Sequence, residues 1–278
     1  MNDLPLVSIL IPAYKGQYFE RALASACKQN YPNLEIVVCD DSSGAGIERF
    51  TREYSGSVGF PVHYSRNQPR LGERGNLARC VAKASGKYVK FLHDDDVLRA
   101  DCVERLVQVM EADPGVILAS SRRQLIDEED NPLPGIPATA FPFASDALID
   151  GGDLLGFLAD YTINFIGEPS CVMCRREDVL GLGEQLMDLG GKRIGWVADL
   201  ALYANLLHRG NLAMLAEPLT SFRVSVWQAS QTGRDKPGIG EKGHADFRQA
   251  IRDLGWYRAN EDNRFVRVAP ITQLKARV

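Results

Sequence analysis

This sequence of 278 residues has no long apolar run, no excess of basic charge and no low-complexity tract. No apolar stretch approaches the roughly 20 residues that a membrane-spanning helix needs, so we expect no transmembrane segment. The formal net charge is −4, which excludes an overall basic field that would recruit nucleic acid or anionic lipid. Hydrophobic residues make up 45% of the chain, which is sufficient for a large globular core.

The six cysteines lack the pattern of a structural metal site. Only Cys171 and Cys174 have a metal-like spacing, and neither a second pair nor histidines follow them closely. They lie in an apolar stretch that is typical of a strand, so we expect ordinary buried cysteines. With no recognisable signal peptide, this indicates the reducing cytoplasm, and we leave open a peripheral contact with the inner face of a membrane.

Strand-like and helix-like segments alternate through the first 120 residues. The expected strands are Val7 to Ile11, Leu34 to Cys39, Pro61 to Ser65, Tyr88 to Leu92 and Val116 to Ser120. The expected helices between them are Tyr18 to Gln29, Ile47 to Tyr54, Glu73 to Ala84 and Asp101 to Glu111. This alternation predicts an α/β fold with right-handed crossovers and a mostly parallel sheet. Ligands of such sheets bind outside the carboxyl ends of the strands.

The second half of the chain has a less regular pattern. A proline-rich stretch from Asn131 to Pro142 predicts a loop. We expect helices near 152–161, 197–208 and 244–254, and strands near 170–174 and 212–215. The polar, glycine-rich stretch from Ser225 to Gly243 predicts a mobile loop that orders when a ligand binds.

Three adjacent carboxylates, Asp94, Asp95 and Asp96, follow the apolar run from Tyr88 to His93. Side by side at the end of a buried strand, they repel one another unless a positive charge lies between them. A divalent metal that bridges a phosphorylated ligand is one explanation, because hard cations take oxygen ligands and share them with phosphates. The alternative is the acidic start of the helix expected from residue 100 to 112.

The order and spacing of several motifs resemble those of family 2 glycosyltransferases, an inverting group with the GT-A fold. The matching stretches are Val7 to Tyr14, Cys39 to Ser43, Leu71 to Asn76, Phe91 to Asp96, Gly167 to Ser170, Trp196 to Leu200, and Phe222 with Arg223. The resemblance implies a Rossmann-like, mostly parallel central sheet flanked by helices. Residues 1–235 would form the transferase domain, with a nucleotide-sugar-binding half (1–120) and a smaller acceptor-binding half (121–235), and residues 236–278 would form a helical C-terminal extension.

The resemblance also implies an activity. The chain would move a sugar from a nucleotide-sugar donor, UDP-linked by the same resemblance, to the hydroxyl of a glycan or glycoconjugate acceptor during surface polysaccharide or glycoconjugate synthesis. Mn²⁺ or Mg²⁺ would act as the Lewis acid for the departing diphosphate. We expect no nucleic-acid partner, and the oligomeric state stays open.

For the metal, the resemblance implies Asp95 as the binding acid, with Asp94 beside the ribose and the metal. Asp96 would orient these two or cap the next helix. The first acid of the usual Asp-x-Asp pattern is replaced by His93. We therefore expect Asp94 and Asp95 to be the working pair, and His93 to be structural or near the nucleotide rather than a ligand. Ser225 stands where many relatives have a histidine, and we leave it out of the metal site.

For the nucleotide, the resemblance implies that Asp41 hydrogen-bonds the base, whereas Asp40 is better explained by an Asx-turn. Pro12 and Tyr14 would leave the first strand where the base stacks. Arg74 binds phosphate or covers the surface of its helix, and both alternatives stay open. Arg223 would contact the diphosphate and Trp227 would cover the sugar, unless both are packing residues of a lid.

The residue expected to be the general base is Asp199, which would take the proton of the acceptor hydroxyl. Its alternative role is the N-cap of the helix from Leu200 to His208. Two other functions remain alternatives. A sugar nucleotidyltransferase would carry a glycine- and arginine-rich loop where Pro12 to Gly16 stand, and a non-catalytic nucleotide-sugar- or glycan-binding protein would explain the missing histidine.

Overall fold

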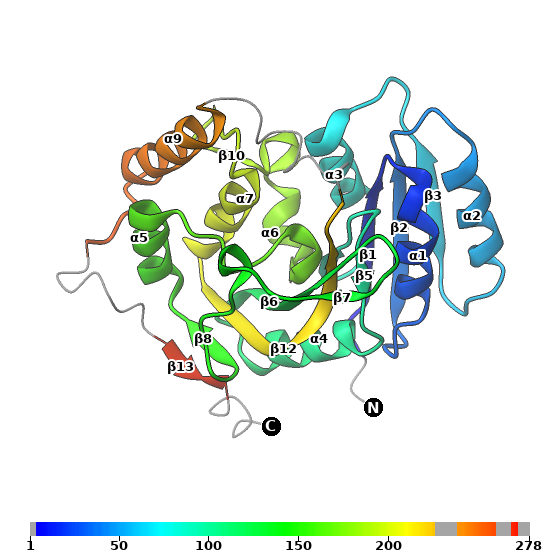
Figure 1. Cartoon of the computed structure of the whole chain (residues 1–278), viewed down its shortest axis with the longest axis horizontal. Coiled ribbons are helices and arrows are strands. Elements are labelled where there is room, and N and C mark those ends of the chain that lie inside the picture. Colours follow the sequence, from blue (N-terminus) through cyan, green and yellow to red (C-terminus); the bar gives the residue numbers. More distant parts are fainter. Residues whose placement is uncertain (1–3, 226–237, 260–267, 272–278) are drawn as a thin grey trace.

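The computed structural model describes residues 4–225, 238–259 and 268–271. Its centre is one large twisted sheet with helices on both faces (Figure 1). The strands are β1 Val7–Ala13, β2 Leu34–Asp40, β3 Val62–Arg66, β4 Tyr88–Phe91, β5 Val97–Leu98, β6 Val116–Ile126, β7 Pro132–Leu133, β8 Ala147–Ile149, β9 Val172–Arg175, β10 Asp188–Leu189, β11 Lys192–Arg193, β12 Asn211–Arg223 and β13 Val268–Pro270. The helices are α1 Gly16–Cys27, α2 Gly46–Ser55, α3 Gly72–Lys83, α4 Cys102–Ala112, α5 Gly151–Tyr161, α6 Arg176–Leu180, α7 Ala198–Leu207 and α9 Ile239–Asp253.

The order across the sheet is β13-β8-β12-β6-β9-β4-β1-β2-β3. Strands β3, β2, β1 and β4 are parallel, as the alternating pattern predicts. Strand β9 then runs antiparallel to both β4 and β6, and β12 pairs in parallel with β6. Because β1 lies between β2 and β4, the loops that follow these three strands meet at one edge of the sheet. The fold is therefore the expected α/β fold with a mostly parallel central sheet.

Alternate residues of each central strand enter two different hydrophobic cores. On β1, Ile9 and Ile11 face the core covered by α1, α2 and α4, while Leu10 faces the core that contains α3, α5, α6, α7 and α9. Both cores are formed from side chains that are almost completely removed from water. Burial on both faces explains why the central strands are nearly continuous apolar runs rather than alternating polar and apolar ones.

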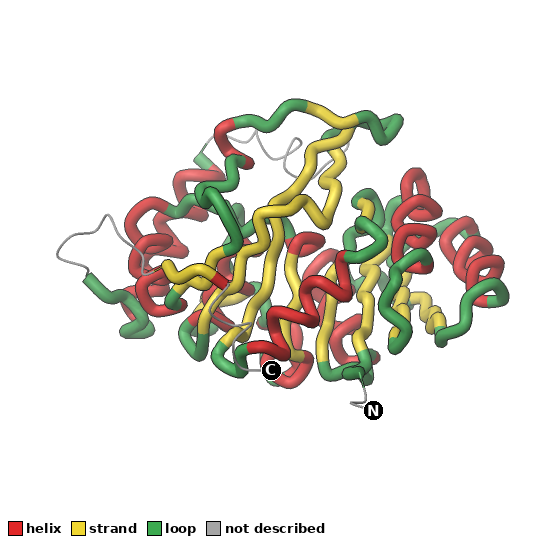
Figure 2. The backbone as a smooth tube through the Cα atoms, turned by 90° about the horizontal axis from the view of Figure 1, so that it is seen from below, coloured by secondary structure: helices red, strands yellow, loops and turns green. Residues whose placement is uncertain are grey.

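The second half differs from the expected pattern in its long strands. Strand β6 continues to Ile126 and β12 to Arg223, well beyond the apolar runs that predicted them. In Figure 2 two strands run past the rest of the sheet to the edge of the molecule, where β7 pairs with β6. Polar residues interrupt their outer parts, with Ser121 to Gln124 on β6 and Thr220 and Ser221 on β12, and hydrophobic periodicity does not detect such a strand.

The C-terminal part also corrects two expectations. Helix α9 begins at Ile239, five residues before the expected start at His244, and β13 adds an edge strand next to β8 where no element was predicted. Residues 226–237 of the expected mobile loop, with Trp227, lie outside the described residues. Among the described residues, no helix is both long and apolar enough to cross a bilayer. The division into residues 1–235 and 236–278 stays a prediction.

Candidate functional site

The acids that follow β2 and β4 flank the end of β1. One carboxylate oxygen of Asp94 accepts the backbone N–H groups of Tyr14 and Lys15, each at 2.6 Å. Burial, together with the neighbouring charge of Asp95, raises the pKa of Asp94 to about 6 in spite of these two bonds. Asp94 therefore fixes the backbone directly after β1, and the edge of the sheet that the sequence predicts is where the acids lie.

Asp41 is buried and holds the start of helix α3. Its carboxylate accepts the backbone N–H of Gly72 at 2.7 Å and that of Leu71 at 3.2 Å, and it also accepts the side-chain amide of Asn67 at 2.6 Å. Gly72 has φ +72°, a conformation that glycine adopts without strain. The neighbouring Asp40 accepts the N–H of Ser42, which confirms the expected Asx-turn.

The aromatic ring expected to stack on a base lies at the surface of this edge. Tyr14 is exposed, and the guanidinium of Arg70 lies 4.2 Å from the centre of its ring. Pro12 was expected to leave the first strand, but β1 continues to Ala13 and Pro12 pairs with Cys39 inside the sheet. Tyr14 is thus the first side chain beyond the strand.

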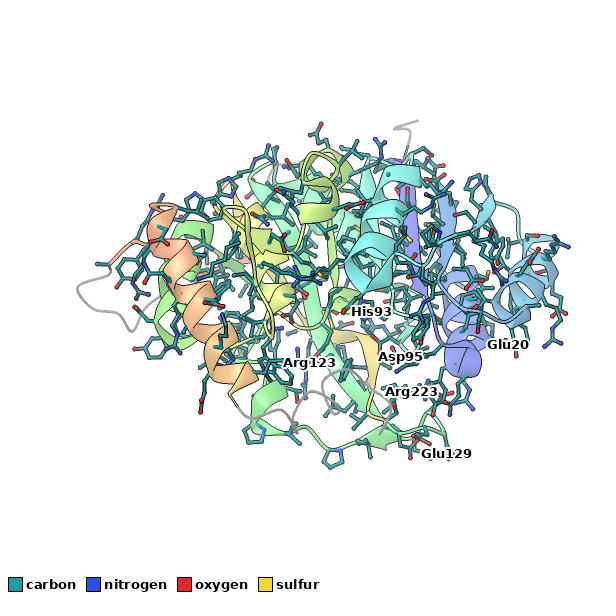
Figure 3. All side chains as sticks on the ribbon, turned by 90° about the horizontal axis from the view of Figure 1, so that it is seen from above. Glu20, His93, Asp95, Arg123, Glu129 and Arg223 are labelled. Atoms are coloured by element: carbon teal, nitrogen blue, oxygen red, sulfur yellow. The ribbon has the colours of Figure 1, made fainter. Side chains whose placement is uncertain are left out.

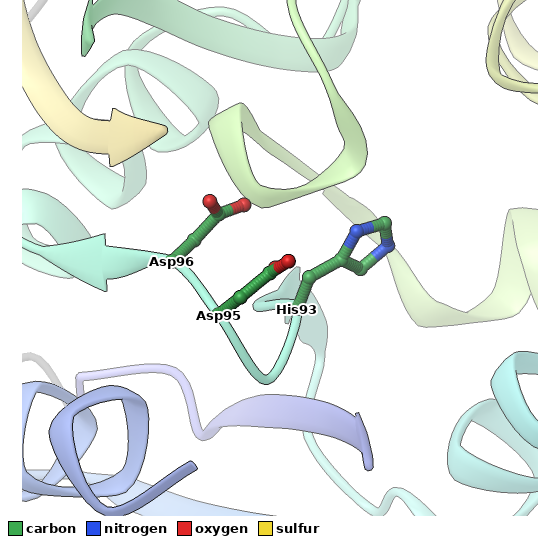
Figure 4. A group of neighbouring side chains, drawn as sticks. All are labelled: His93, Asp95 and Asp96. Atoms are coloured by element: carbon green, nitrogen blue, oxygen red, sulfur yellow. The ribbon is translucent and has the colours of Figure 1, made fainter. Parts of the chain in front are cut away.

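A second group of side chains projects from the loop between β4 and β5. One ligand atom from each of His93, Asp95 and Asp96 lies within 4.8 Å of the others, and Figure 4 shows the three side chains on the same side of the loop. Burial, with the neighbouring charge of Asp95, raises the pKa of Asp96 to about 7. The expected pair was Asp94 with Asp95. The structure instead groups Asp95 with Asp96 and His93, because Asp94 turns toward the end of β1.

Arg223 holds this loop from the end of β12. Its backbone N–H donates to Asp96 Oδ1 at 3.0 Å, and its Nε donates to the backbone oxygen of Asp95 at 2.8 Å. The same guanidinium donates to the backbone oxygen of Asp127 at 2.6 Å and forms an ion pair with Asp130. Arg223 is fully buried, so its observed contacts position this loop, residues 92–96, which we call the acid loop.

Asp199 lies in the first turn of α7, but it does not cap that helix. The N-cap is Val197, so the alternative N-cap role of Asp199 is not observed. Its carboxylate accepts the backbone N–H of Leu200 and the side-chain amide of Asn164. Burial, together with the negative charge of Glu168, raises the pKa of Asp199 to about 6. A carboxyl with such a pKa is ionised at neutral pH and is a stronger base than an exposed aspartate.

The segment 166–171 connects the acid loop with the surroundings of Asp199. At one end, the Ser170 hydroxyl accepts the backbone N–H of His93 at 2.9 Å. At the other end, Gly167 exchanges hydrogen bonds with Asn164, the partner of Asp199. In Figure 3, His93 and Asp95 lie in the middle of the molecule, with Arg223 drawn below Asp95 and Arg123 to the left. One short segment thus links the acid loop to Asn164, which bonds to the Asp199 carboxylate in α7.

Arg74 does not reach the acid loop through any described contact. From α3 it donates to the backbone oxygens of Met187 and Ile194 and forms an ion pair with Asp188. These acceptors belong to the β10–β11 hairpin, which leads into α7. Of the two alternatives for Arg74, the observed contacts are those of a packing residue that ties α3 to this hairpin.

Replacing Arg74 with alanine should lower the free energy of unfolding by about 1.5–3 kcal/mol, because hydrogen bonds to a charged group are lost and their acceptors become unpaired. Urea unfolding with linear extrapolation measures the change. The matched control is Arg79→Ala on the exposed face of the same helix, for which we expect a change within about 0.5 kcal/mol. Equal losses in both variants would contradict the anchoring role.

Sequence reasoning missed several residues around Asp199. Arg123 forms an ion pair with Glu168 at 3.4 Å and donates to the backbone oxygen of Asn164. The sequence would have indicated Arg123 only if the strand predicted to end at Ser120 had been extended. Arg123 would then lie on β6, which is placed between β12 and β9 in the sheet. Asn164 follows α5 in an irregular segment, and nothing in its local sequence indicates a contact with α7.

Comparisons with known proteins bear on the family and the fold of the chain. The family profile described as "Glycosyl transferase family 2" matches residues 8–180. An uncharacterised protein of Mycobacterium tuberculosis (strain CDC 1551 / Oshkosh) is 31% identical over 237 residues, which are 83% of this chain and 70% of that protein. The UDP-Glc:alpha-D-GlcNAc-diphosphoundecaprenol beta-1,3-glucosyltransferase WfgD of Escherichia coli is 32% identical over 40% of this chain and 42% of its own length.

Among solved structures, residues 1–349 of TarS from S. aureus in complex with UDP-GlcNAc superpose with a TM-score of 0.67 at 15% identity. That match covers 92% of this chain and 68% of the TarS chain, and it shows a shared fold. The chain spans less than half the length of several relatives that it matches, with a share of 42% for the E. coli glucosyltransferase.

Proposed function

This chain belongs to glycosyl transferase family 2, and we propose that it moves a sugar from a UDP-linked donor to a hydroxyl acceptor with inversion at the anomeric carbon. The observation that carries the proposal is that the segment 166–171 links the acid loop to the surroundings of Asp199. Its Ser170 bonds to His93 in the acid loop, and its Gly167 bonds to Asn164, the partner of Asp199. A donor diphosphate on one side and an acceptor hydroxyl on the other would place the anomeric carbon between them.

In this reaction the Asp199 carboxylate takes the proton of the acceptor hydroxyl. The oxygen attacks the anomeric carbon as the bond from that carbon to the diphosphate oxygen breaks, and the electron pair of that bond leaves with the nucleoside diphosphate. The raised pKa of Asp199 makes it a better proton acceptor than an exposed carboxylate. Asn164 and the N–H of Leu200 hold its two oxygens in place.

A divalent cation, Mn²⁺ or Mg²⁺, would stabilise the charge of the departing diphosphate as a Lewis acid when bound. Asp95 is the residue we propose for it, because its carboxylate is partly exposed while Asp94 bonds to the backbone after β1. Asp94 would then shape the nucleotide side of the site by fixing Tyr14. Pro12 would support Tyr14 from within β1, and Asp41, whose carboxylate bonds to the start of α3, would position that segment beside the base. Arg74 and Arg223, whose guanidinium groups bond to the chain itself, position neighbouring segments in this proposal.

The biological setting is proposed from the relatives alone. The matched glucosyltransferase of E. coli acts, by its name, on a diphosphoundecaprenol-linked sugar. We propose a related glycan or glycoconjugate acceptor in surface polysaccharide synthesis, at the cytoplasmic side of a membrane.

A panel of nucleotide sugars tests the donor class through thermal unfolding in the presence of Mn²⁺. A UDP-sugar present at 100 times its Kd should stabilise the native state by about 2.7 kcal/mol, and this should raise Tm by several degrees. GDP-, ADP- and CDP-sugars at the same concentration serve as controls. Stabilisation by one of those controls and not by any UDP-sugar would contradict the proposed donor.

A further inference from the structure

We propose that His93 and Asp96 join Asp95 as direct ligands of the divalent cation, so that the metal site of this chain contains one imidazole nitrogen and two carboxylates. The inference deepens the proposed function and rests on it for the presence of a cation. It differs from the expectation drawn from sequence, in which Asp94 was the second ligand and His93 was not a ligand.

The first argument is the distance between the donor atoms. Ligands that bind one cation at about 2.1 Å lie about 3 Å apart when adjacent and about 4.2 Å apart when opposite. The donor atoms of His93, Asp95 and Asp96 are within 4.8 Å of one another, so side-chain movements of well under 1 Å would bring them onto a shared ion. The three side chains also point to the same side of their loop (Figure 4).

The second argument is an unpaired atom. Asp96 is completely buried, its Oδ1 accepts the backbone N–H of Arg223, and its Oδ2 has no hydrogen-bond partner among the described residues. A buried polar atom without a partner costs about 1–3 kcal/mol, and more for a charged group, so native proteins rarely keep one without a reason. A cation held with Asp95 and His93 would satisfy this oxygen.

The third argument is the way in which the loop is fixed. Arg223 bonds to Asp96 Oδ1 and to the backbone oxygen of Asp95, while Ser170 accepts the N–H of His93. These bonds hold the backbone at all three positions and leave the imidazole, the Asp95 carboxylate and Asp96 Oδ2 for the ion. The fourth candidate, Asp94, commits one oxygen to Tyr14 and Lys15.

Nitrogen coordination has a direct spectroscopic signature. The full chain is freed of metal with a chelator and loaded with Mn²⁺ alone, and electron spin-echo envelope modulation is recorded without donor or acceptor. We expect ¹⁴N modulation from a coordinated imidazole, and we expect His93→Gln to abolish it. His93→Gln should also weaken Mn²⁺ binding by at least the roughly 10- to 100-fold that loss of an outer-shell partner costs.

The matched control is His63→Gln. The chain has four histidines, and His63 is exposed on β3 beside Glu35, so its variant should keep both the modulation and the affinity. A second variant, His93→Asp, replaces nitrogen by oxygen, and it should lower the ratio of Co²⁺ to Mg²⁺ affinity by roughly tenfold, because imidazole favours the later transition metals.

The outcomes separate this inference from the proposed function. Tight Mn²⁺ binding without ¹⁴N modulation, or modulation that survives in His93→Gln, overturns the ligand assignment and leaves a metal-dependent transferase intact. Mn²⁺ binding that Asp96→Asn leaves unchanged overturns the assignment of Asp96 alone. No Mn²⁺ binding in the wild-type chain, without or with a UDP-sugar, overturns the inference and the metal dependence in the proposed function together.

Discussion

Asp199→Asn should lower kcat for sugar transfer by about 10²- to 10⁴-fold, the usual contribution of general acid–base catalysis. The amide is nearly the same size as the carboxylate but cannot accept the proton of the acceptor hydroxyl. Donor binding should change little, because the carboxylate of Asp199 bonds to Asn164 and to the N–H of Leu200 and to none of the residues proposed for the donor. Steady-state transfer assays and donor titrations measure the two quantities separately.

The same substitution should have only a small effect on stability. Burial raises the pKa of Asp199 from its ordinary value of 3.8 to about 6, so its ionisation lowers the stability progressively as the pH rises between these values, and the loss is complete above about 6. Asparagine removes that penalty, although it loses a hydrogen bond worth about 1 kcal/mol, because its amide nitrogen cannot accept from Asn164. A variant that is inactive because it is unfolded would be recognised by circular dichroism and would not support the assignment.

The pH dependence of the wild-type enzyme provides an independent check of this role. With a pKa of about 6 in the free chain, the basic form of Asp199 is lost as the pH falls through 6, so kcat/KM should fall tenfold per pH unit below it and be flat above it. Glu168→Gln removes the nearby charge that raises this pKa and should shift the acid limb to lower pH. If the acid side of the pH–rate profile is the same in Glu168→Gln as in the wild type, or if Asp199→Asn keeps wild-type turnover, the base is another group.

The second large effect is expected at the acid loop. Asp95→Asn should lower kcat/KM by about 10³-fold or more, because a Lewis acid contributes several kcal/mol to the transition state and each 1.36 kcal/mol is a factor of ten. The loss should be smaller at high Mn²⁺ concentration to the extent that the variant still binds the ion weakly. Transfer rates measured over a Mn²⁺ titration give both the maximal rate and the apparent metal affinity.

Asp101→Asn is the matched control for this variant. Asp101 is a nearby acid on the same stretch of chain, but it forms an ion pair with Arg99 at the start of α4 and is not part of the acid loop. Its substitution removes the same charge and should leave the rate within about twofold, as for most surface changes. A comparable loss of rate in both variants would indicate a general effect of charge rather than a bound cation.

Much of the fold follows from the local sequence. The apolar runs and helical spacings of the first 120 residues predict β1 to β4 and α1 to α4 closely, and the runs are most continuous in β1, β2 and β4, whose two faces are buried. The outer parts of β6 and β12, in which polar residues interrupt the apolar ones, and the edge strand β13 were not predictable in the same way. Their stability comes from pairing with distant strands, and pairing leaves no periodic signal in a short window of sequence.

The candidate site divides in a similar way. The sequence by itself determined that acids follow β2 and β4, that these acids meet at one edge of the sheet, and that Asp199 lies near the start of a helix. Only the tertiary structure decided which carboxylates face one another. Asp94 turns to the backbone after β1, whereas Asp96 is fixed by Arg223, 127 residues away along the chain, and His93 by Ser170. Side-chain direction in a loop is set by such distant partners, so adjacent residues with the same chemistry acquire different roles.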